Sequence, residues 1–214
     1  SGMQDAGVIA CAKHFPGHGD TDVDSHKDLP VINHSLERLR EVEFQPFQYL
    51  TQMGVMSVMT AHLYIPAIDD RKNIAVSISD KAINGILRRE MGFTGLSFTD
   101  ALNMQGVAKF HPDGELELKA LMAGNDVLLA PGDIPKAKRL IRKAMEDGRL
   151  SEEYVWDKVH KILNYKHAMG LHEWEPHNEY GVEKDLNTTE AKHINYQLVE
   201  QTMCLVKDNA SLLP

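Results

Sequence analysis

The sequence predicts an α/β protein whose strands lie parallel in one sheet. Four short apolar runs, at 7–12, 55–61, 95–99 and 126–130, have the length and composition of buried strands. Amphipathic segments with helical periodicity separate them, which is typical of strand–helix–strand units. Polar side chains follow the first three runs, and parallel α/β proteins hold their functional residues at such strand ends.

Capping residues mark the expected helices. Ser35 is a suitable N-cap for a helix that continues to Gly54, and Pro46 is expected to kink or split it. Ser79 is expected to cap a second helix that runs through Met91. Glycines end three further amphipathic segments and predict helices at 115–123, 136–146 and 151–169.

The composition bounds the classes of function. A net charge of −8 argues against a nucleic acid as partner. No apolar run approaches the length of a membrane span. The two cysteines, Cys11 and Cys204, imply no disulfide framework and leave the compartment open.

One stretch concentrates the side chains that carry chemistry. Residues 12–26 read AKHFPGHGDTDVDSH and contain three His, three Asp and one Lys. The stretch from Asp20 resembles a calcium loop of the EF-hand type, but Ser25 stands where the loop needs Gly and Val31 where it needs a bidentate Glu. A calcium site is therefore a poor fit.

Two other interpretations of this stretch are open. A zinc site would use His14, His18 and His26, although the intervening Pro and Gly exclude a helical His pair. An acid/base dyad would use Asp24 and His26, because a carboxylate two residues away can orient an imidazole and favour its protonated form.

The same residues carry a family resemblance. The motif KHFPGHG at 13–19, followed by DSH at 24–26, resembles the signature of glycoside hydrolase family 3 in its bacterial β-N-acetylglucosaminidase branch. The resemblance implies that Lys13 and His14 bind sugar hydroxyls. It also implies that His26, paired with Asp24, is the general acid/base.

The family's nucleophile is expected in the segment GLSFTDALNM, where Asp100 follows the third strand. Ala101 stands where the family has a second acid, so Asp100 is the only carboxylate of the segment. Without the motif, a cap of the next helix would be the favoured role of Asp100. Met104 occupies the place of a methionine that touches the sugar in the family. His62, at the end of the second strand, either lines the site or is a satisfied structural histidine.

The resemblance also implies a TIM-like (β/α)8 barrel, and four strand–helix units are half of one. We therefore expect an α/β carboxyl-terminal half-barrel at 1–171, a linker at 172–187 and a helix at 188–214 that leads to a missing second domain. Such a fragment is expected to be inactive alone. It is also expected to associate with itself or with the missing amino-terminal half, because uncovered strand edges are rarely tolerated.

The activity that the resemblance implies is retaining hydrolysis of terminal β-linked N-acetylglucosamine. Its expected context is peptidoglycan or muropeptide turnover in a bacterium, and the compartment, cytoplasmic or exported to the periplasm, is open. No cofactor and no metal are expected. A histidine base, unlike a carboxylate, would not repel an anionic acceptor, so we also expect phosphate to compete with water. A catalytically inactive sugar-binding fragment and a metal-dependent hydrolase that uses His14, His26 and the aspartates are the alternatives.

Overall fold

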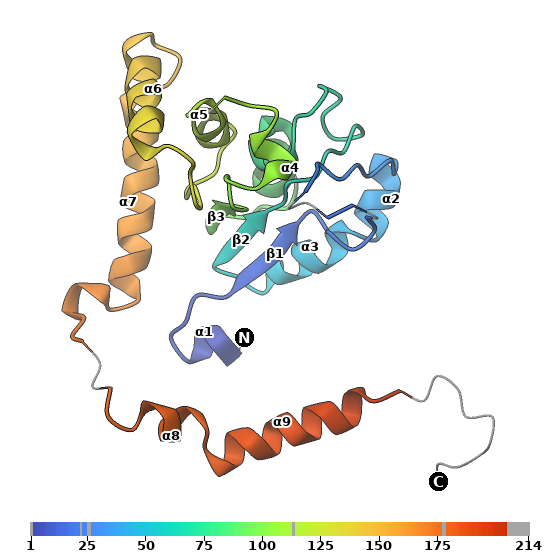
Figure 1. Ribbon diagram of the computed structural model, residues 1–214, viewed down its shortest axis with the longest axis vertical. Helices are drawn as coiled ribbons and strands as arrows, with labels where there is room; N and C mark the ends of the chain where they lie inside the picture. Colours follow the sequence, from blue (N-terminus) through green and yellow to red (C-terminus); the bar gives the residue numbers. More distant parts are fainter. Residues whose placement is uncertain (1, 22, 25–26, 113, 177–178, 205–214) are drawn as a thin grey trace, which may run out of the picture. The chain divides into compact units, whose positions relative to one another are not determined.

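The computed structural model forms two compact units, one up to His172 and one from Glu173 (Figure 1). The first unit contains the sheet and the predicted site residues. The structure describes residues 2–21, 23–24, 27–112, 114–176 and 179–204.

A small parallel sheet lies at the centre of the first unit (Figure 1). Among the described residues its strands are β1 (Cys11–Phe15), β2 (Ser57–Thr60) and β3 (Leu96–Thr99), in that order. β2 and β3 pair without interruption, whereas the register of β1 on β2 shifts between Ala12 and Phe15. The predicted α/β class with parallel strands is confirmed.

The first strand begins later than the apolar run predicts. Residues 7–12 were expected to be a buried strand, but Val8 is 53% exposed and the strand extends from Cys11 to Phe15. Among the described residues β1 pairs only with β2, so it is an edge strand and its apolar start is not enclosed. Lys13 and His14 consequently belong to the strand and not to a loop that follows it.

The expected fourth strand, at 126–130, is wrong in extent. Val127 forms a single parallel bridge with Phe98, and the backbone N–H of Thr99 donates to the carbonyl oxygen of Val127 at 3.0 Å. Ala130 has a φ of 44°, which lies in the left-handed region and interrupts an extended chain. The segment therefore runs parallel to β3 for only one bridge.

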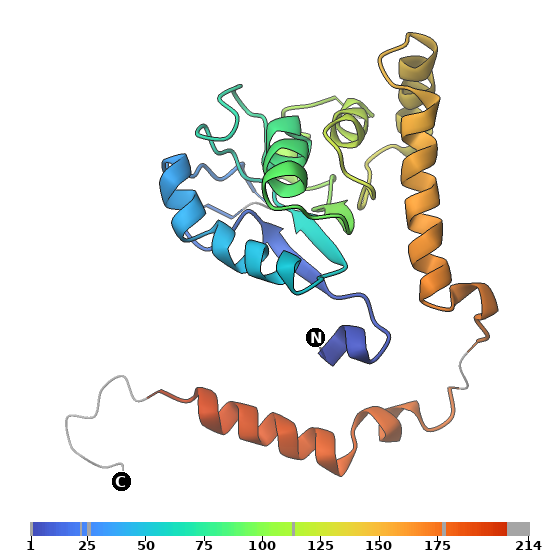
Figure 2. The ribbon, with the colours of Figure 1, turned by 180° about the vertical axis from the view of Figure 1, so that it is seen from behind.

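The helix expected after Ser35 is split, as predicted, but the break at Val42 and Glu43 precedes Pro46. Its two parts are α2 (Leu36–Glu41) and α3 (Phe44–Gln52), and Pro46 lies in the first turn of α3, where its ring is tolerated. The hydroxyl of Ser35 accepts the N–H of Arg38 at 3.2 Å, as predicted for an N-cap. α3 packs along β1, and Figure 2 shows this side of the unit.

The predicted helix after Ser79 is η2 (Lys81–Glu90), which has wide π-type turns. Its residues Ile83, Ile86 and Leu87 are buried, as the periodicity predicted. The predicted helices at 115–123, 136–146 and 151–169 are confirmed, whereas α1, η1 and α4 were not predicted. The remaining elements of the first unit are α1 (Gly2–Asp5), η1 (Val76–Ile78), α4 (Gln105–Ala108), α5 (Glu115–Met122), α6 (Ile134–Glu146) and α7 (Glu152–Ala168).

The second unit carries the helix expected from 188. It contains α8 (Val182–Leu186) and α9 (Thr189–Thr202), and η3 (Leu171–Glu173) lies at the boundary between the units. The hydroxyl of Thr188 accepts the N–H of Ala191 at 3.1 Å and caps α9. Residues 205–214, with the expected end of this helix, lie outside the described residues. Across the described ranges, no helix has both the length and the apolar character needed to cross a membrane.

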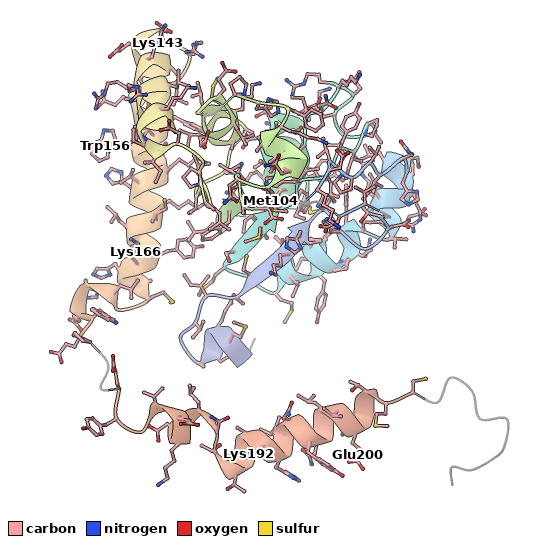
Figure 3. All side chains as sticks on the ribbon, in the orientation of Figure 1. Met104, Lys143, Trp156, Lys166, Lys192 and Glu200 are labelled. Carbon is pink, nitrogen blue, oxygen red and sulfur yellow. The ribbon has the colours of Figure 1, made fainter. Side chains whose placement is uncertain are left out.

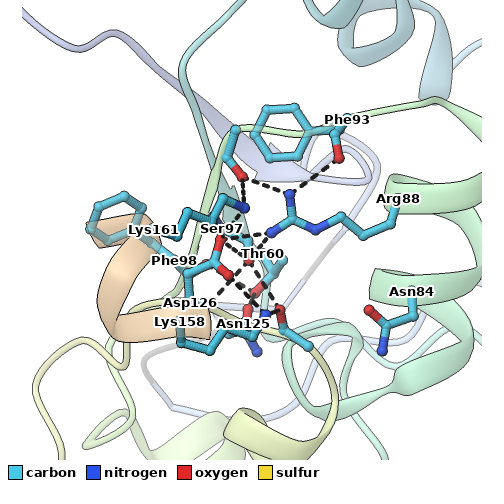
Figure 4. Close-up of polar contacts among 12 residues, drawn as sticks. Thr60, Asn84, Arg88, Phe93, Ser97, Phe98, Asn125, Asp126, Lys158 and Lys161 are labelled. Atoms are coloured by element: carbon cyan, nitrogen blue, oxygen red, sulfur yellow. Dashed lines mark hydrogen bonds and ion pairs between the residues drawn. The ribbon is translucent and has the colours of Figure 1, made fainter. Parts of the chain in front are cut away.

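A buried ion cluster ties α7 to the sheet (Figure 4). The carboxylate of Asp126 accepts hydrogen bonds from Arg88 at 2.7 Å, Lys158 at 2.8 Å and Lys161 at 2.9 Å, and its side chain has no exposed surface. The backbone N–H of Ser97, in β3, also donates to it at 2.9 Å. Burial raises the pKa of Asp126, but the three cations more than offset this and lower the pKa to about 2.

Candidate active site

The carboxyl ends of the three strands bring three of the predicted site residues together. His14 lies in β1, His62 follows β2, and Asp100 follows β3. The Nε2 atom of His14 lies 3.9 Å from Oδ2 of Asp100, and Nε2 of His62 lies 2.9 Å from the carbonyl oxygen of Ala101. Because parallel strands end at the same edge of a sheet, residues far apart in sequence share one site.

The carboxylate of Asp100 has one oxygen held and one facing His14. Oδ1 accepts the N–H of Ala101 at 2.8 Å, whereas Oδ2 is the atom nearest to His14. The side chain is 15% exposed. Helix α4 begins at Gln105 with Met104 as its N-cap, so Asp100 does not cap it. The alternative of a helix cap is therefore wrong for this helix.

His14 is partly buried beside this carboxylate. Its side chain is 31% exposed, and its ring lies edge-on to the ring of His18, with centroids 6.0 Å apart. Burial lowers the pKa of His14, Asp100 raises it in part, and Lys13 and His18 lower it further. The lowered pKa favours the neutral imidazole, in which one nitrogen can donate to a hydroxyl group and the other can accept from one. Lys13 itself is exposed.

His62 has no exposed surface. Its Nε2 atom donates to the carbonyl of Ala101 at 2.9 Å, and its Nδ1 atom lies 2.7 Å from the hydroxyl oxygen of Ser77. Both ring nitrogens are occupied, as in a satisfied structural histidine. The expectation that His62 binds substrate stays a prediction, and the contacts instead connect it to the peptide that follows Asp100.

The predicted dyad lies only partly within the described residues. Asp24 is exposed, and its carbonyl oxygen accepts the N–H groups of Lys27 at 2.9 Å and Asp28 at 3.1 Å. His26 lies outside the described residues. The pairing of Asp24 with His26 stays a prediction.

Two polar side-chain contacts involve Asp20 and Asp28, which lie on either side of Asp24 in the sequence. Oδ2 of Asp20 lies 2.6 Å from Nε2 of His34. In the second contact Lys109, which follows α4, donates to Asp28 at 2.6 Å and lowers the pKa of that carboxyl. The sequence pattern did not indicate either pair, because their members lie far apart in the chain.

Met104 is at the start of α4, close to the strand ends (Figure 3). It is 8% exposed and belongs to the buried residues of the first unit. Its predicted contact with the sugar stays a prediction.

The described part of the chain contains no group of three or more His, Cys, Asp or Glu side chains arranged to hold a metal ion. The zinc interpretation includes His26 and the calcium interpretation includes Ser25, and both residues lie outside the described ranges.

Sequence reasoning missed three buried polar residues that are linked by hydrogen bonds to one another and, through Thr60, to the backbone of Asp100. Thr60, Ser77 and Asn125 have no exposed surface. The Thr60 hydroxyl donates to Oδ1 of Asn125 at 3.1 Å, and the side-chain amide of Asn125 donates to the carbonyl of Ser77 at 2.8 Å. The only available signal was an Asn directly before an apolar run, which is not specific.

Comparisons with known proteins identify the family of this chain. The model of the glycosyl hydrolase family 3 N terminal domain matches residues 1–165, and the chain therefore belongs to this family. The predicted resemblance is confirmed. Among curated bacterial relatives, the beta-hexosaminidase A of Pseudoalteromonas piscicida is 31% identical, and the match covers 75% of this chain and 30% of that relative. The beta-hexosaminidase of Methylobacillus flagellatus is 29% identical, and the match covers 80% of this chain and 48% of that relative.

Solved structures agree with the fold as well. A glycoside hydrolase family 3 beta-N-acetylglucosaminidase from Paenibacillus sp. str. FPU-7 is 36% identical, with a TM-score of 0.85 over 94% of this chain and 38% of that one. A beta-glucoside phosphorylase, BglX, is 26% identical, with a TM-score of 0.89 over 99% and 40%. The chain thus spans less than half of the length of these relatives.

Proposed function

We propose that the protein that carries this chain hydrolyses terminal β-linked N-acetylglucosamine and retains the configuration of the sugar. The observation that carries the proposal is the carboxylate of Asp100, with Oδ1 held by the N–H of Ala101 and Oδ2 facing His14. The family membership and the relatives named beta-hexosaminidase support the substrate class. Turnover of peptidoglycan or muropeptides is the proposed context.

The proposed mechanism has two displacements. Oδ2 of Asp100 attacks the anomeric carbon, and the bond to the leaving oxygen breaks as His26 gives that oxygen its proton. The neutral His26 then takes a proton from water, whose oxygen attacks the anomeric carbon and releases Asp100. An imidazole with an ordinary pKa of about 6.5 can serve as the acid near neutral pH, which a carboxyl group can do only when its pKa is raised.

Three of the other predicted site residues, Lys13, His14 and Met104, would bind and orient the sugar. Lys13 and His14 are proposed to contact its hydroxyls, since Lys13 is exposed and His14 lies beside the carboxylate that would attack. Met104, near the strand ends, would touch the ring. Asp24 would orient His26.

The acid/base role of His26 is tested by leaving groups. His26→Ala, made in the complete reading frame that contains this chain, should slow glycosides with poor leaving groups far more than activated aryl glycosides, because only the former need a proton. kcat/KM measured across a series of leaving-group pKa values checks this. Equal losses for both kinds of substrate would remove His26 from the role.

Full activity after dialysis against a chelator is also expected. Loss of activity after this dialysis would favour the metal-dependent hydrolase.

Transfer to phosphate is a second candidate activity. The structural similarity to a beta-glucoside phosphorylase supports it, as does a base that carries no negative charge to repel an anionic acceptor. In concentrated phosphate we expect some glycosyl phosphate beside the free sugar. Mass spectrometry of the products measures the ratio, with sulfate at equal ionic strength as the control, and free sugar alone would contradict this activity.

We further propose that β1 is completed by another part of the barrel, supplied by the amino-terminal half or by a second copy. β1 is an edge strand among the described residues. An apolar groove of about 350 Å³ lies beside it, lined by residues that include Cys11, Leu50 and Met53. Met53 is 65% exposed. Exposed strand edges with apolar neighbours favour association.

Association of the isolated chain is therefore the expected result. Light scattering coupled to size exclusion should give a mass above the 24.0 kDa of one chain. Met53→Glu should shift the mass toward one chain, whereas Ile134→Glu, an equally polar change at a 56% exposed residue of α6, should not. A cooperative monomer would contradict the proposal. Turnover by that monomer would contradict the expectation that the fragment is inactive.

A further inference from the structure

His62 connects the peptide that follows Asp100 to η1. Its Nε2 atom contacts the carbonyl oxygen of Ala101 at 2.9 Å, and its Nδ1 atom contacts the hydroxyl of Ser77 at 2.7 Å. His62 and Ser77 are both fully buried. A buried polar ring whose nitrogens are both used has a defined orientation, because turning it would leave two groups unpaired.

A second set of contacts returns from Ser77 to Asp100. The amide of Asn125 donates to the carbonyl of Ser77 at 2.8 Å. Its Oδ1 atom accepts the hydroxyl of Thr60 at 3.1 Å, and the same hydroxyl lies 3.1 Å from the carbonyl oxygen of Phe98, which shares its hydrogen. The carbonyl of Thr60 accepts the backbone N–H of Asp100 at 2.9 Å. Together with His62 these contacts close a ring of hydrogen bonds that passes through the backbone of Asp100 and Ala101.

The acceptor chemistry settles the tautomer of His62. A carbonyl oxygen can only accept, so Nε2 carries the hydrogen. Burial lowers the pKa of His62, the Ala101 carbonyl and Asp100 raise it in part, and His14 lowers it further. The ring is therefore neutral at neutral pH, and Nδ1 accepts the hydroxyl hydrogen of Ser77.

We propose that His62 is a positioning residue for Asp100 and does not touch the substrate. The N–H of Ala101 holds Oδ1 of Asp100, and His62 holds the carbonyl of the same residue, so His62 fixes Ala101 and, through it, the N–H that orients the carboxylate. Orientation of a nucleophile within a fraction of an ångström decides how often it reaches the anomeric carbon. The inference rests on the proposed role of Asp100.

Two serines offer a matched test. Ser77 and Ser79 are both buried, and each hydroxyl donates a 2.7 Å hydrogen bond, Ser77 to His62 and Ser79 to the carboxylate of Asp69. Ser77→Ala releases the ring of His62. Ser79→Ala removes a buried hydrogen bond of the same length outside the ring, and also the 3.3 Å bond that its hydroxyl accepts from the N–H of Ala82. Thermal unfolding of both variants shows whether they lose comparable stability.

The expected results separate positioning from structure and from binding. In the complete reading frame, Ser77→Ala should lower kcat about 10-fold and His62→Phe about 100-fold with KM unchanged, because misplacement of about 1 Å can cost that much. His62→Gln, which keeps an N–H donor for Ala101, should recover part of the loss. Ser79→Ala should keep kcat within about twofold, as a change that leaves the reacting groups in place does.

Four outcomes would overturn the proposal. Equal losses of kcat in Ser77→Ala and Ser79→Ala would mean that the ring of hydrogen bonds is merely structural. A higher KM with unchanged kcat in His62→Gln would make His62 a substrate contact. If the pH profile of kcat/KM for His62→Gln lost one limb, His62 would be an acid or a base. Substitution of a neutral positioning residue lowers the whole profile without changing its shape. Unchanged kcat in Ser77→Ala and His62→Gln would remove the role.

Failure of the proposed function gives a different result. If Asp100→Asn keeps its activity, Asp100 is not the nucleophile, whatever the serine variants do. If His62→Phe does not fold, Ser77→Ala and His62→Gln still decide the role, because each removes only one of the two contacts of the ring.

Discussion

Replacing Asp100 with Asn in the complete reading frame is expected to reduce turnover of aryl β-N-acetylglucosaminides by roughly 10³-fold or more. An amide oxygen can still accept the N–H of Ala101, so the local fold is preserved. It cannot form the glycosyl ester and does not stabilise the positive charge that develops at the anomeric carbon. Initial rates with an activated aryl glycoside measure the loss.

The matched control is Asp133→Asn. The carboxylate of Asp133 also accepts a backbone N–H, that of Lys136 at 2.8 Å, but it caps α6. Asn is an equally good N-cap, so activity and stability should be unchanged. If Asp100→Asn retained more than a few per cent of the activity while folded, another residue would be the nucleophile.

The largest effect on stability is expected from Asp126→Ala. The change leaves Arg88, Lys158 and Lys161 around a site that has lost its only acidic partner in the cluster of Figure 4. Removal of one member of a buried ion pair costs about 3–5 kcal/mol. The free energy of unfolding, from denaturant titration near neutral pH, should fall by that order.

The pH dependence provides an independent check on Asp126. Its pKa is lowered from 3.8 to about 2 in the folded protein, so its contribution is complete above pH 4 and is lost as the pH falls through 2. The difference between the unchanged protein and Asp126→Ala should therefore shrink in acid. As the control, Asp147→Ala removes an exposed carboxylate beside Arg149 and should change little. A loss in Asp126→Ala no larger than in this control would contradict the prediction.

Periodicity and capping predicted most helices well. The apolar face of η2 and the bounds of α5, α6 and α7 follow from residues that are neighbours in the chain. The strands were harder to predict, because an apolar run does not reveal which part pairs. Cys11–Phe15 pairs with β2 although it contains Lys13 and His14, whereas the more apolar segment at 126–130 contributes a single bridge.

The site residues were likewise predictable only in part. Two separate motifs that carry the family resemblance indicated His14 and Asp100, and the structure brings their side chains to 3.9 Å. The sequence could not indicate that His62 is occupied on both nitrogens, because its partners Ser77 and Ala101 lie 15 and 39 residues away. Long-range hydrogen bonds of this kind depend on the packing of the whole unit, and no local pattern encodes them.

Trapping the glycosyl-enzyme tests the role of Asp100 most directly. Fluorine destabilises the positive charge that develops in both transition states and so slows both steps. A good leaving group offsets this only in the first step, so a fluorinated N-acetylglucosaminide with such a group forms the ester faster than water removes it. Proteolysis and mass spectrometry of the complete protein then locate the sugar. The account predicts the label on the peptide that contains Asp100, whereas a label on another carboxylate would contradict it.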